Sequence, residues 1–214
     1  MRKYNIDDNF FKNQSHEMAY IMGFLAADGN IAKNENGIFL EVHQHDEELL
    51  KQFCEITQSN RPLAYRVNNN GTPCVKMKVW SAAWKQDLAK YGIIPNKTFT
   101  LQSPSLLAPQ YRMDYIRGYF DGDGSCYLCK GKVPYVQINS ASKELIEWIR
   151  NEFAQIGVST NDLTVNKLES GNNFYRLTYS RIGNIQKIYN AFYHENAKIF
   201  LKRKEKIMKI INSL

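Results

Sequence analysis

The chain has 214 residues, of which 43% are hydrophobic and 13% aromatic, enough for a core of one or two domains. Lysines and arginines outnumber acidic residues by 28 to 21, and most of the net charge of +7 lies in residues 101–214. This balance favours a polyanionic partner, although a solvated basic surface would have the same composition. No signal peptide and no run of about 18 apolar residues is present, so we expect no membrane association and an intracellular protein, in the cytoplasm, the nucleoid or an organelle matrix.

The first predicted element is a helix that ends in Ala-Tyr-Ile-Met-Gly-Phe-Leu-Ala-Ala-Asp-Gly-Asn, residues 19–30. Gly23 and Ala27 are four residues apart and therefore share one helix face. A glycine inside a helix costs about 1 kcal/mol relative to alanine, so we expect this face to pack closely against a second helix. Gly29 predicts that the helix stops at Asp28, with the glycine in the left-handed conformation.

Alternating patterns follow this helix. Residues 38–43, 63–67 and 75–79 alternate between apolar and polar side chains and predict half-buried strands, with a turn at Asn-Asn-Asn-Gly, residues 68–71. Asp46 and Ser81 are placed to cap two helices. We predict the order helix–strand–strand–helix–strand–strand–helix for the first half.

The second half repeats this order. Residues 95–110 contain three prolines and no periodicity, which predicts a linker. Residues 114–125 then read Asp-Tyr-Ile-Arg-Gly-Tyr-Phe-Asp-Gly-Asp-Gly-Ser, a second copy of the first helix that ends at Asp123 and Gly124. Strand patterns at 136–138, 163–165 and 175–179 and helices after Ser142 and over 182–192 follow, and a last basic helix is predicted over roughly 198–211.

The repeat brings two acids to equivalent places, 95 positions apart. Asp28 and Asp123 each end a helix, where the helix dipole already leaves negative charge, so two of them side by side are unfavourable without a cation. Carboxylates suit hard cations such as Mg²⁺, and paired metals are the usual arrangement for cutting phosphodiesters. One Asp-Gly could simply end a helix, but two copies with matching glycines predict a paired active site on a pseudo-two-fold axis.

These residues resemble the LAGLIDADG homing endonucleases. Residues 21–29 and 116–124 align with the nine-letter motif, and the first copy departs from it at Ala26, where the motif has an earlier, structural acid. Two motifs in one chain resemble the monomeric members. The resemblance implies an α+β fold of two pseudo-symmetric αββαββα halves, residues 1–97 and 111–214, joined by a linker over 98–110, packed through the motif helices and each bearing a four-stranded antiparallel DNA-binding sheet.

The resemblance also implies a function. It is site-specific, metal-dependent hydrolysis of both strands of a long double-stranded DNA target, leaving short 3′ overhangs, as in intron homing. The expected cofactor is Mg²⁺, with Mn²⁺ able to substitute and Ca²⁺ binding without cleavage. The implied metal ligands are Asp28 and Asp123 with the backbone of Ala27 and Gly122. Intron RNA is a further candidate partner.

Other residues are expected to border the metal site. The resemblance matches Lys97 and Lys204 to basic residues that stabilise phosphoryl charge, with Lys202 as an alternative to Lys204. It matches Gln44 and Ser140 to polar residues that order water. Both lysines could equally be solvated surface charges.

Base contacts are expected from the outward side chains of the predicted strands, because a β-ribbon in the major groove presents every second residue to the bases. The alternate residues that are predicted to face outward are Arg66, Lys76, Lys78, His43, Tyr135, Gln137, Asn139, Arg176 and Thr178. Ordinary exposure explains any one of them equally well. His43 and His45 share the predicted strand face, but no third metal ligand accompanies them.

Two alternatives remain open. The same fold is used by RNA maturases and by DNA-binding regulators, although the two aspartates favour a nuclease. An unrelated α/β small-molecule enzyme lacks support, since neither a phosphate loop nor a catalytic triad nor a cofactor motif is evident, and no intein splicing domain fits in this length. The four cysteines include one C-x-x-C, at Cys126 and Cys129, and are expected to be free thiols rather than a zinc site.

Overall fold

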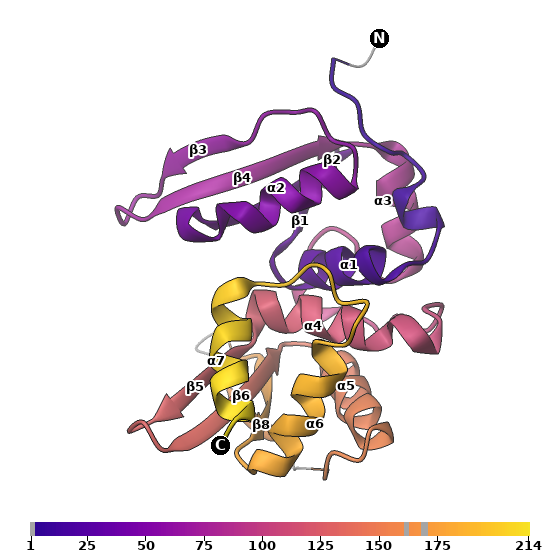
Figure 1. Cartoon of the computed structure of the whole chain (residues 1–214). Coiled ribbons are helices and arrows are strands. Elements are labelled where there is room, and N and C mark those ends of the chain that lie inside the picture. Colours follow the sequence, from indigo (N-terminus) through magenta and orange to yellow (C-terminus); the bar gives the residue numbers. More distant parts are fainter. Residues whose placement is uncertain (1–2, 161–162, 168–170) are drawn as a thin grey trace.

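The structure is a computed structural model that describes residues 3–160, 163–167 and 171–214. Its two halves share the order helix–strand–strand–helix–strand–strand–helix, as the sequence predicts, and the second half ends in an additional helix (Figure 1). The first half comprises α1 (His16–Asp28), β1 (Asn30–Ile31), β2 (Gly37–His43), α2 (Glu47–Ile56), β3 (Ala64–Val67), β4 (Pro73–Trp80) and α3 (Ala82–Lys90). The second comprises α4 (Arg112–Asp123), β5 (Ser125–Cys129), β6 (Val133–Ser140), α5 (Lys143–Gln155), β7 (Thr164–Lys167), β8 (Asn173–Tyr179), α6 (Ile182–Phe192) and α7 (Lys202–Asn212).

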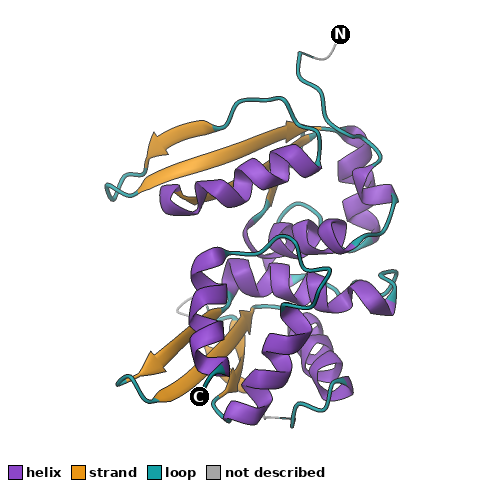
Figure 2. Cartoon of the chain, viewed as in Figure 1, coloured by secondary structure: helices purple, strands orange, loops and turns teal. Residues whose placement is uncertain are grey.

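Each half contains one four-stranded antiparallel sheet, in the order β1-β2-β4-β3 and β5-β6-β8-β7. Helices cover one face of each sheet, and the other face is left without a helix (Figure 2). Alternate residues of β6, namely Pro134, Val136, Ile138 and Ser140, are buried, whereas Tyr135, Gln137 and Asn139 are partly exposed. This alternation is the expected signature of a sheet with one covered face.

Helices α1 and α4 pack against each other at the centre of the molecule (Figure 1). The predicted small residues permit this contact. A Cβ atom on Gly23 would lie 2.0 Å from the Tyr115 carbonyl oxygen, and one on Gly118 would lie 2.0 Å from the Tyr20 carbonyl oxygen. The two contacts exchange under the pseudo-two-fold relation, so the backbones approach too closely for any side chain at these two positions.

The helix stops are where the sequence predicts them, but the reason differs. Gly29 has φ −72° and Gly124 φ −86°, so neither is left-handed. A Cβ on Gly29 would lie 2.4 Å from the Leu25 carbonyl oxygen, and one on Gly124 would lie 2.2 Å from a ring carbon of Phe120. Glycine is required here because the chain folds back over its own helix.

Three further expectations need correction. The last helix begins at Lys202, because the segment before it is extended and Leu201 donates its backbone N–H to Asp121. His45 lies in a 3-10 turn after β2 and therefore shares no strand face with His43, although their rings are 4.4 Å apart. Asp46 precedes α2 without capping it, since its carboxylate pairs with Arg203 of the other half at 3.0 Å.

The segment between the halves contains two 3-10 turns, Lys97–Phe99 and Pro109–Tyr111, and is fastened to both halves. The Gln14 side chain donates to the Leu106 carbonyl and accepts from the Ala108 amide, and Ser142 donates to the Leu101 carbonyl. The described residues include no helix that is long and apolar enough to cross a membrane.

Candidate active site

The two motif aspartates lie at the adjoining ends of the central helices. Asp28 is the last residue of α1, and Asp123 is the last residue of α4. Both side chains are exposed, so a ligand can reach them. The two helices are in contact up to this end, since a Cβ on Gly122 would lie 2.4 Å from the Ala27 Cβ and 3.2 Å from Asp28 Oδ2.

The pKa values of both carboxyl groups are raised by their surroundings. Desolvation by the surrounding protein, followed by the negative charge of Asp123, raises the pKa of Asp28 from 3.8 to about 6. Desolvation also raises the pKa of Asp123, but the neighbouring Lys97, Lys204 and Tyr119 hydroxyl lower it. Each side chain therefore keeps an exposed edge while its inner side is packed, and the pair concentrates negative charge there.

The two predicted lysines lie directly behind the aspartates, and neither is a surface charge. Lys97 is 8% exposed and donates to the carbonyl of Gly29, and Lys204 is 4% exposed. The Lys204 ammonium donates to the carbonyls of Phe120 at 2.6 Å, Asp121 at 2.8 Å and Gly124 at 2.5 Å. Each lysine thus neutralises the negative end of one motif helix. Lys202, the alternative to Lys204, is exposed.

The residues at the ends of β2 and β6 differ between the halves. Gln44 is exposed in the 3-10 turn after β2. Ser140 is buried at the end of β6, and its hydroxyl accepts from the Ser142 amide at 3.1 Å. The structure therefore places these two polar groups in different environments.

Tyr119 is a site residue that the sequence analysis did not single out. Its hydroxyl donates to the Asn139 carbonyl at 3.0 Å, and its nearness to Asp123 lowers the pKa of that carboxyl. The equivalent position in the first motif, 95 residues earlier, is Phe24, which has no hydroxyl to offer Asp28. This difference is visible when the two copies are aligned, and it makes the two halves of the site chemically unequal.

Open space adjoins each aspartate. A cavity of about 290 Å³ beside Asp123 is lined by residues that include Lys97 and Tyr119. A second of about 290 Å³ beside Asp28 is lined by residues that include His43, Asp46 and Arg203. A large ligand can therefore approach the aspartate pair from either half.

The predicted base-contacting residues share the uncovered faces of the two sheets. In the first sheet, Lys78 lies opposite Phe39 and Lys76 lies opposite Glu41, while Arg66 and His43 both lie opposite Cys74. In the second, the paired positions are Gln137 with Thr178 and Asn139 with Arg176, and Tyr135 lies opposite Tyr127. The strand pattern thus identified residues that share a face.

Three sets of contacts on these faces were not predicted. Glu41 accepts two hydrogen bonds from Arg66, at 2.6 and 2.8 Å, and lies 3.8 Å from Lys76. It therefore neutralises part of the positive charge expected on the first sheet. In the second sheet, Asn139 accepts from Arg176 at 2.9 Å, and the rings of Tyr127 and Tyr135 stack at 5.3 Å.

The donor set fits a hard divalent cation. Two carboxylates with open edges lie at the same end of the helix pair, and desolvation followed by the charge of Asp123 raises the pKa of Asp28. The Ala27 and Gly122 backbones lie within the same helix ends. Oxygen donors of this kind are the ligands that Mg²⁺ and Ca²⁺ prefer.

Comparison with known proteins agrees with this description. The LAGLIDADG-like domain family matches residues 110–203. No curated protein sequence matches the chain.

Solved structures match over nearly the whole chain. I-DmoI in complex with DNA and Ca is 14% identical with a TM-score of 0.57, and the match covers 95% of this chain and 99% of that chain. I-WcaI bound to its DNA recognition sequence is 15% identical with a TM-score of 0.55, covering 94% and 90%. Full-length WhiA from Thermatoga maritima is 12% identical with a TM-score of 0.55; the match covers 97% of this chain but only 64% of that protein.

At these identities the likeness is one of fold. Residues 110–203 match the LAGLIDADG-like domain family, and the chain as a whole shares the fold of the solved homing endonucleases, a fold that WhiA also has.

Proposed function

We propose that this protein is a site-specific DNA endonuclease that hydrolyses both strands of a long target, with Mg²⁺ as cofactor and short 3′ overhangs as products. The observation that carries the proposal is the pair of exposed aspartates at the adjoining ends of two helices, flanked by two uncovered sheet faces. The structural neighbours that were solved with DNA support a DNA partner. We further propose that it acts as a monomer inside the cell, with both half-sites supplied by one chain.

The residues divide the work by position. Side chains on the uncovered sheet faces hold the duplex, with amides suited to adenine and arginine and lysine suited to guanine or phosphate. Asp28 and Asp123, with the adjacent backbone, hold the cation, which when bound activates water and stabilises charge on the phosphoryl oxygens. Lys97 and Lys204 donate to backbone carbonyls at the ends of the motif helices. Their positive charges offset the negative helix ends, which allows two carboxylates to lie there side by side.

The first test is cleavage selection on a randomised duplex library in Mg²⁺, run beside Asp28→Asn and Asp123→Asn. We expect the parent to yield one long motif and each variant to lose about 100-fold or more in cutting rate, because one carboxylate ligand is missing. Glu17→Gln removes the same charge from the opposite end of α1 and is expected to cut like the parent.

Binding separates the proposal from its alternatives. With Ca²⁺ in place of Mg²⁺, the parent and both Asn variants should retain the selected duplex. Full double-strand cutting by either Asn variant would refute the assignment of the aspartates. A parent that retains DNA or RNA tightly at moderate salt and cuts neither is a regulator or a maturase. Replacing Mg²⁺ by Mn²⁺ is expected to preserve cutting.

A further inference from the structure

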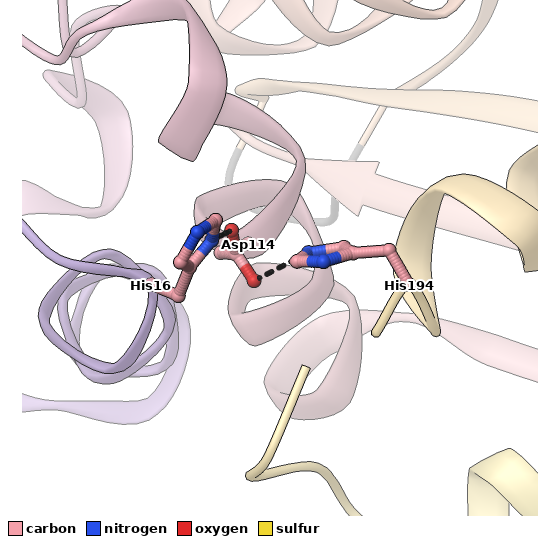
Figure 3. A group of neighbouring side chains, drawn as sticks. All are labelled: His16, Asp114 and His194. Carbon is pink, nitrogen blue, oxygen red and sulfur yellow. Dashed lines mark hydrogen bonds and ion pairs between the residues drawn. The ribbon is translucent and has the colours of Figure 1, made fainter. Parts of the chain in front are cut away.

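A second cluster of ligand-type side chains lies at the other end of the motif helices, far along both helices from the aspartates. It consists of His16, Asp114 and His194 (Figure 3). His16 is the first residue of α1, Asp114 lies in the first turn of α4, and His194 follows the end of α6. The three residues therefore join the first half of the chain to the second.

The ligand atoms converge on one carboxylate. His16 Nδ1 is 2.7 Å from Asp114 Oδ2, and His194 Nε2 is 3.1 Å from Asp114 Oδ1. One ligand atom from each residue lies within 4.8 Å of the others, and the two imidazole rings have centroids 5.1 Å apart. Figure 3 shows both rings turned toward the carboxylate from neighbouring elements.

Asp114 is held in place by a buried arginine. Arg117, one turn further along α4, forms an ion pair with Asp114 Oδ1 at 2.8 Å, and it also donates a hydrogen bond to the Phe192 carbonyl. Both side chains have no exposed surface. A carboxylate that is oriented by a second partner is the usual support of a metal ligand, and here Oδ2 is left to His16 alone.

The cluster is open on the histidine side. His16 and His194 are 27% and 26% exposed, whereas Asp114 is fully buried, so an ion from solvent meets the imidazoles first. Two imidazoles and one carboxylate are a common protein ligand set for zinc, which then takes water as its fourth ligand. Magnesium and calcium prefer oxygen ligands and suit this set poorly.

We propose that His16, Asp114 and His194 form a binding site for a divalent transition metal of the zinc class, separate from the aspartate pair. Ligand atoms around zinc are roughly 3.3 Å apart, given bond lengths of about 2.0–2.1 Å. Binding therefore moves each imidazole nitrogen slightly outward from its contact with Asp114 at 2.7 or 3.1 Å, and draws the three ligand atoms, which lie within 4.8 Å of one another, around the ion. The bound ion ties α1 to α4 and to the segment after α6.

Metal binding requires only that each histidine change its tautomer, with no net gain or loss of protons by the two rings. A neutral His16 that donates from Nδ1 becomes a ligand when its proton moves to Nε2, through exchange with water. His194 undergoes the reverse shift, from Nε2 to Nδ1. The backbone N–H of Asn196 donates to His194 Nδ1 at 3.2 Å in the metal-free protein. This group is exposed, so it donates to water instead once Nδ1 carries the proton. The net charge of the two rings is unchanged.

The test uses the full chain carrying both Asp28→Asn and Asp123→Asn, so that the aspartate pair cannot compete for the probe. Zn²⁺ is titrated by calorimetry, Co²⁺ by visible absorption, and melting temperature is measured with and without Zn²⁺. We expect one Zn²⁺ per chain, the d–d absorption of Co²⁺ in a nitrogen and oxygen site, and a rise of about 5 °C or more in melting temperature at a hundred times Kd.

The control variants are His16→Gln and His194→Gln in the same background. A glutamine amide can still donate a hydrogen bond to Asp114, so folding in a chelator should be little changed, while Zn²⁺ binding should fall at least 10-fold. The proposal is overturned if the Asp28→Asn, Asp123→Asn protein shows no Zn²⁺ binding, which would mean that the three side chains only hydrogen-bond to one another. It is also overturned if both Gln variants bind Zn²⁺ as strongly as that protein does. Because the experiment involves no DNA, its outcome is independent of the proposed nuclease function.

Discussion

Position 26 of the first motif holds alanine, whereas its counterpart in the second motif, Asp121, is a buried acid. Tyr20 of α1 donates its hydroxyl to Asp121 Oδ2 at 2.6 Å. The pseudo-two-fold relation would give Tyr115 of α4 the same bond to position 26, but alanine has no acceptor. The Tyr115 hydroxyl is accordingly buried without a hydrogen-bond partner among the described residues.

This asymmetry predicts opposite results for two equivalent substitutions. Tyr20→Phe should lower the free energy of unfolding by about 1.5–3 kcal/mol, because Asp121 loses a donor inside the protein. Tyr115→Phe should be neutral or slightly stabilising, because it removes a hydroxyl that is desolvated without compensation. Urea unfolding of the two variants beside the parent measures the difference. Equal losses for both would show that the Tyr115 hydroxyl has a partner, such as ordered water.

The carboxyl of Asp28 predicts how metal binding depends on pH. Its pKa is raised from 3.8 to about 6, so between about pH 4 and pH 6 the folded protein binds a proton that the unfolded chain releases. Without metal, this group therefore stabilises the fold less as the pH rises through that window. A bound cation requires the deprotonated carboxylate, so metal affinity should change in the opposite direction and rise toward neutral pH.

Calorimetry with Ca²⁺ tests this in buffers of different ionisation enthalpy. At pH 6 we expect proton release on binding, and at pH 8 almost none. Asp28→Asn should reduce the proton release at pH 6, leaving only what Asp123 contributes, and remove its own part of the pH dependence of the melting temperature in a chelator. Release that is equal at the two pH values would contradict the raised pKa.

At the scale of elements, the central helix pair depends on glycines that contact backbone rather than side chains. Gly118→Ala would place a Cβ 2.0 Å from the Tyr20 carbonyl oxygen, so the helices must separate. We expect a loss of about 3 kcal/mol or more, since the clashing atom cannot rotate away. Gly183→Ala in α6 is the matched control, because a Cβ there meets nothing within 4 Å. That variant should be neutral or up to about 1 kcal/mol more stable.

Thermal or urea unfolding compares the two alanine variants. Binding of each variant to DNA in Ca²⁺ should decrease as its free energy of unfolding decreases, because the helix pair determines how the two sheets are positioned relative to each other. A Gly118→Ala protein as stable as the parent would show that α1 and α4 do not approach as closely as the structure has them.

The elements themselves follow from local patterns, which explains how much of the fold the sequence predicts. Alternation in β6 and the capping serines Ser81 and Ser142 are properties of neighbouring residues, and both predictions are confirmed. The start of α7 and the role of Asp46 were wrong because each depends on a partner in another element, Asp121 and Arg203 respectively. The same holds for Lys97 and Lys204, since a sequence pattern does not show whether a lysine reaches a helix end.

At the scale of the whole molecule, part of the positive charge of the first sheet is neutralised by the protein's own acidic residues. Glu41 lies on the uncovered face of the first sheet, where it pairs with Arg66 and lies near Lys76. The pKa of Glu41 is lowered, mainly by the hydrogen bond from Arg66, so it remains charged at neutral pH. Residues 1–100 have a net charge of only +1. Glu41 pairs with two of the basic side chains that are predicted to contact DNA, Arg66 and Lys76.

Glu41→Gln should therefore strengthen binding to random-sequence duplex DNA and make it more dependent on salt. Freed Arg66 and Lys76 side chains can meet phosphates, and each added phosphate contact steepens the plot of log affinity against log salt by about 0.9. Glu55→Gln, which removes an exposed charge from α2, is the matched control and should change the slope less. Affinities measured between about 50 and 200 mM salt, with Ca²⁺ present, give both slopes. If the two variants behave alike, net charge alone governs binding, and the first sheet is not the surface that meets DNA.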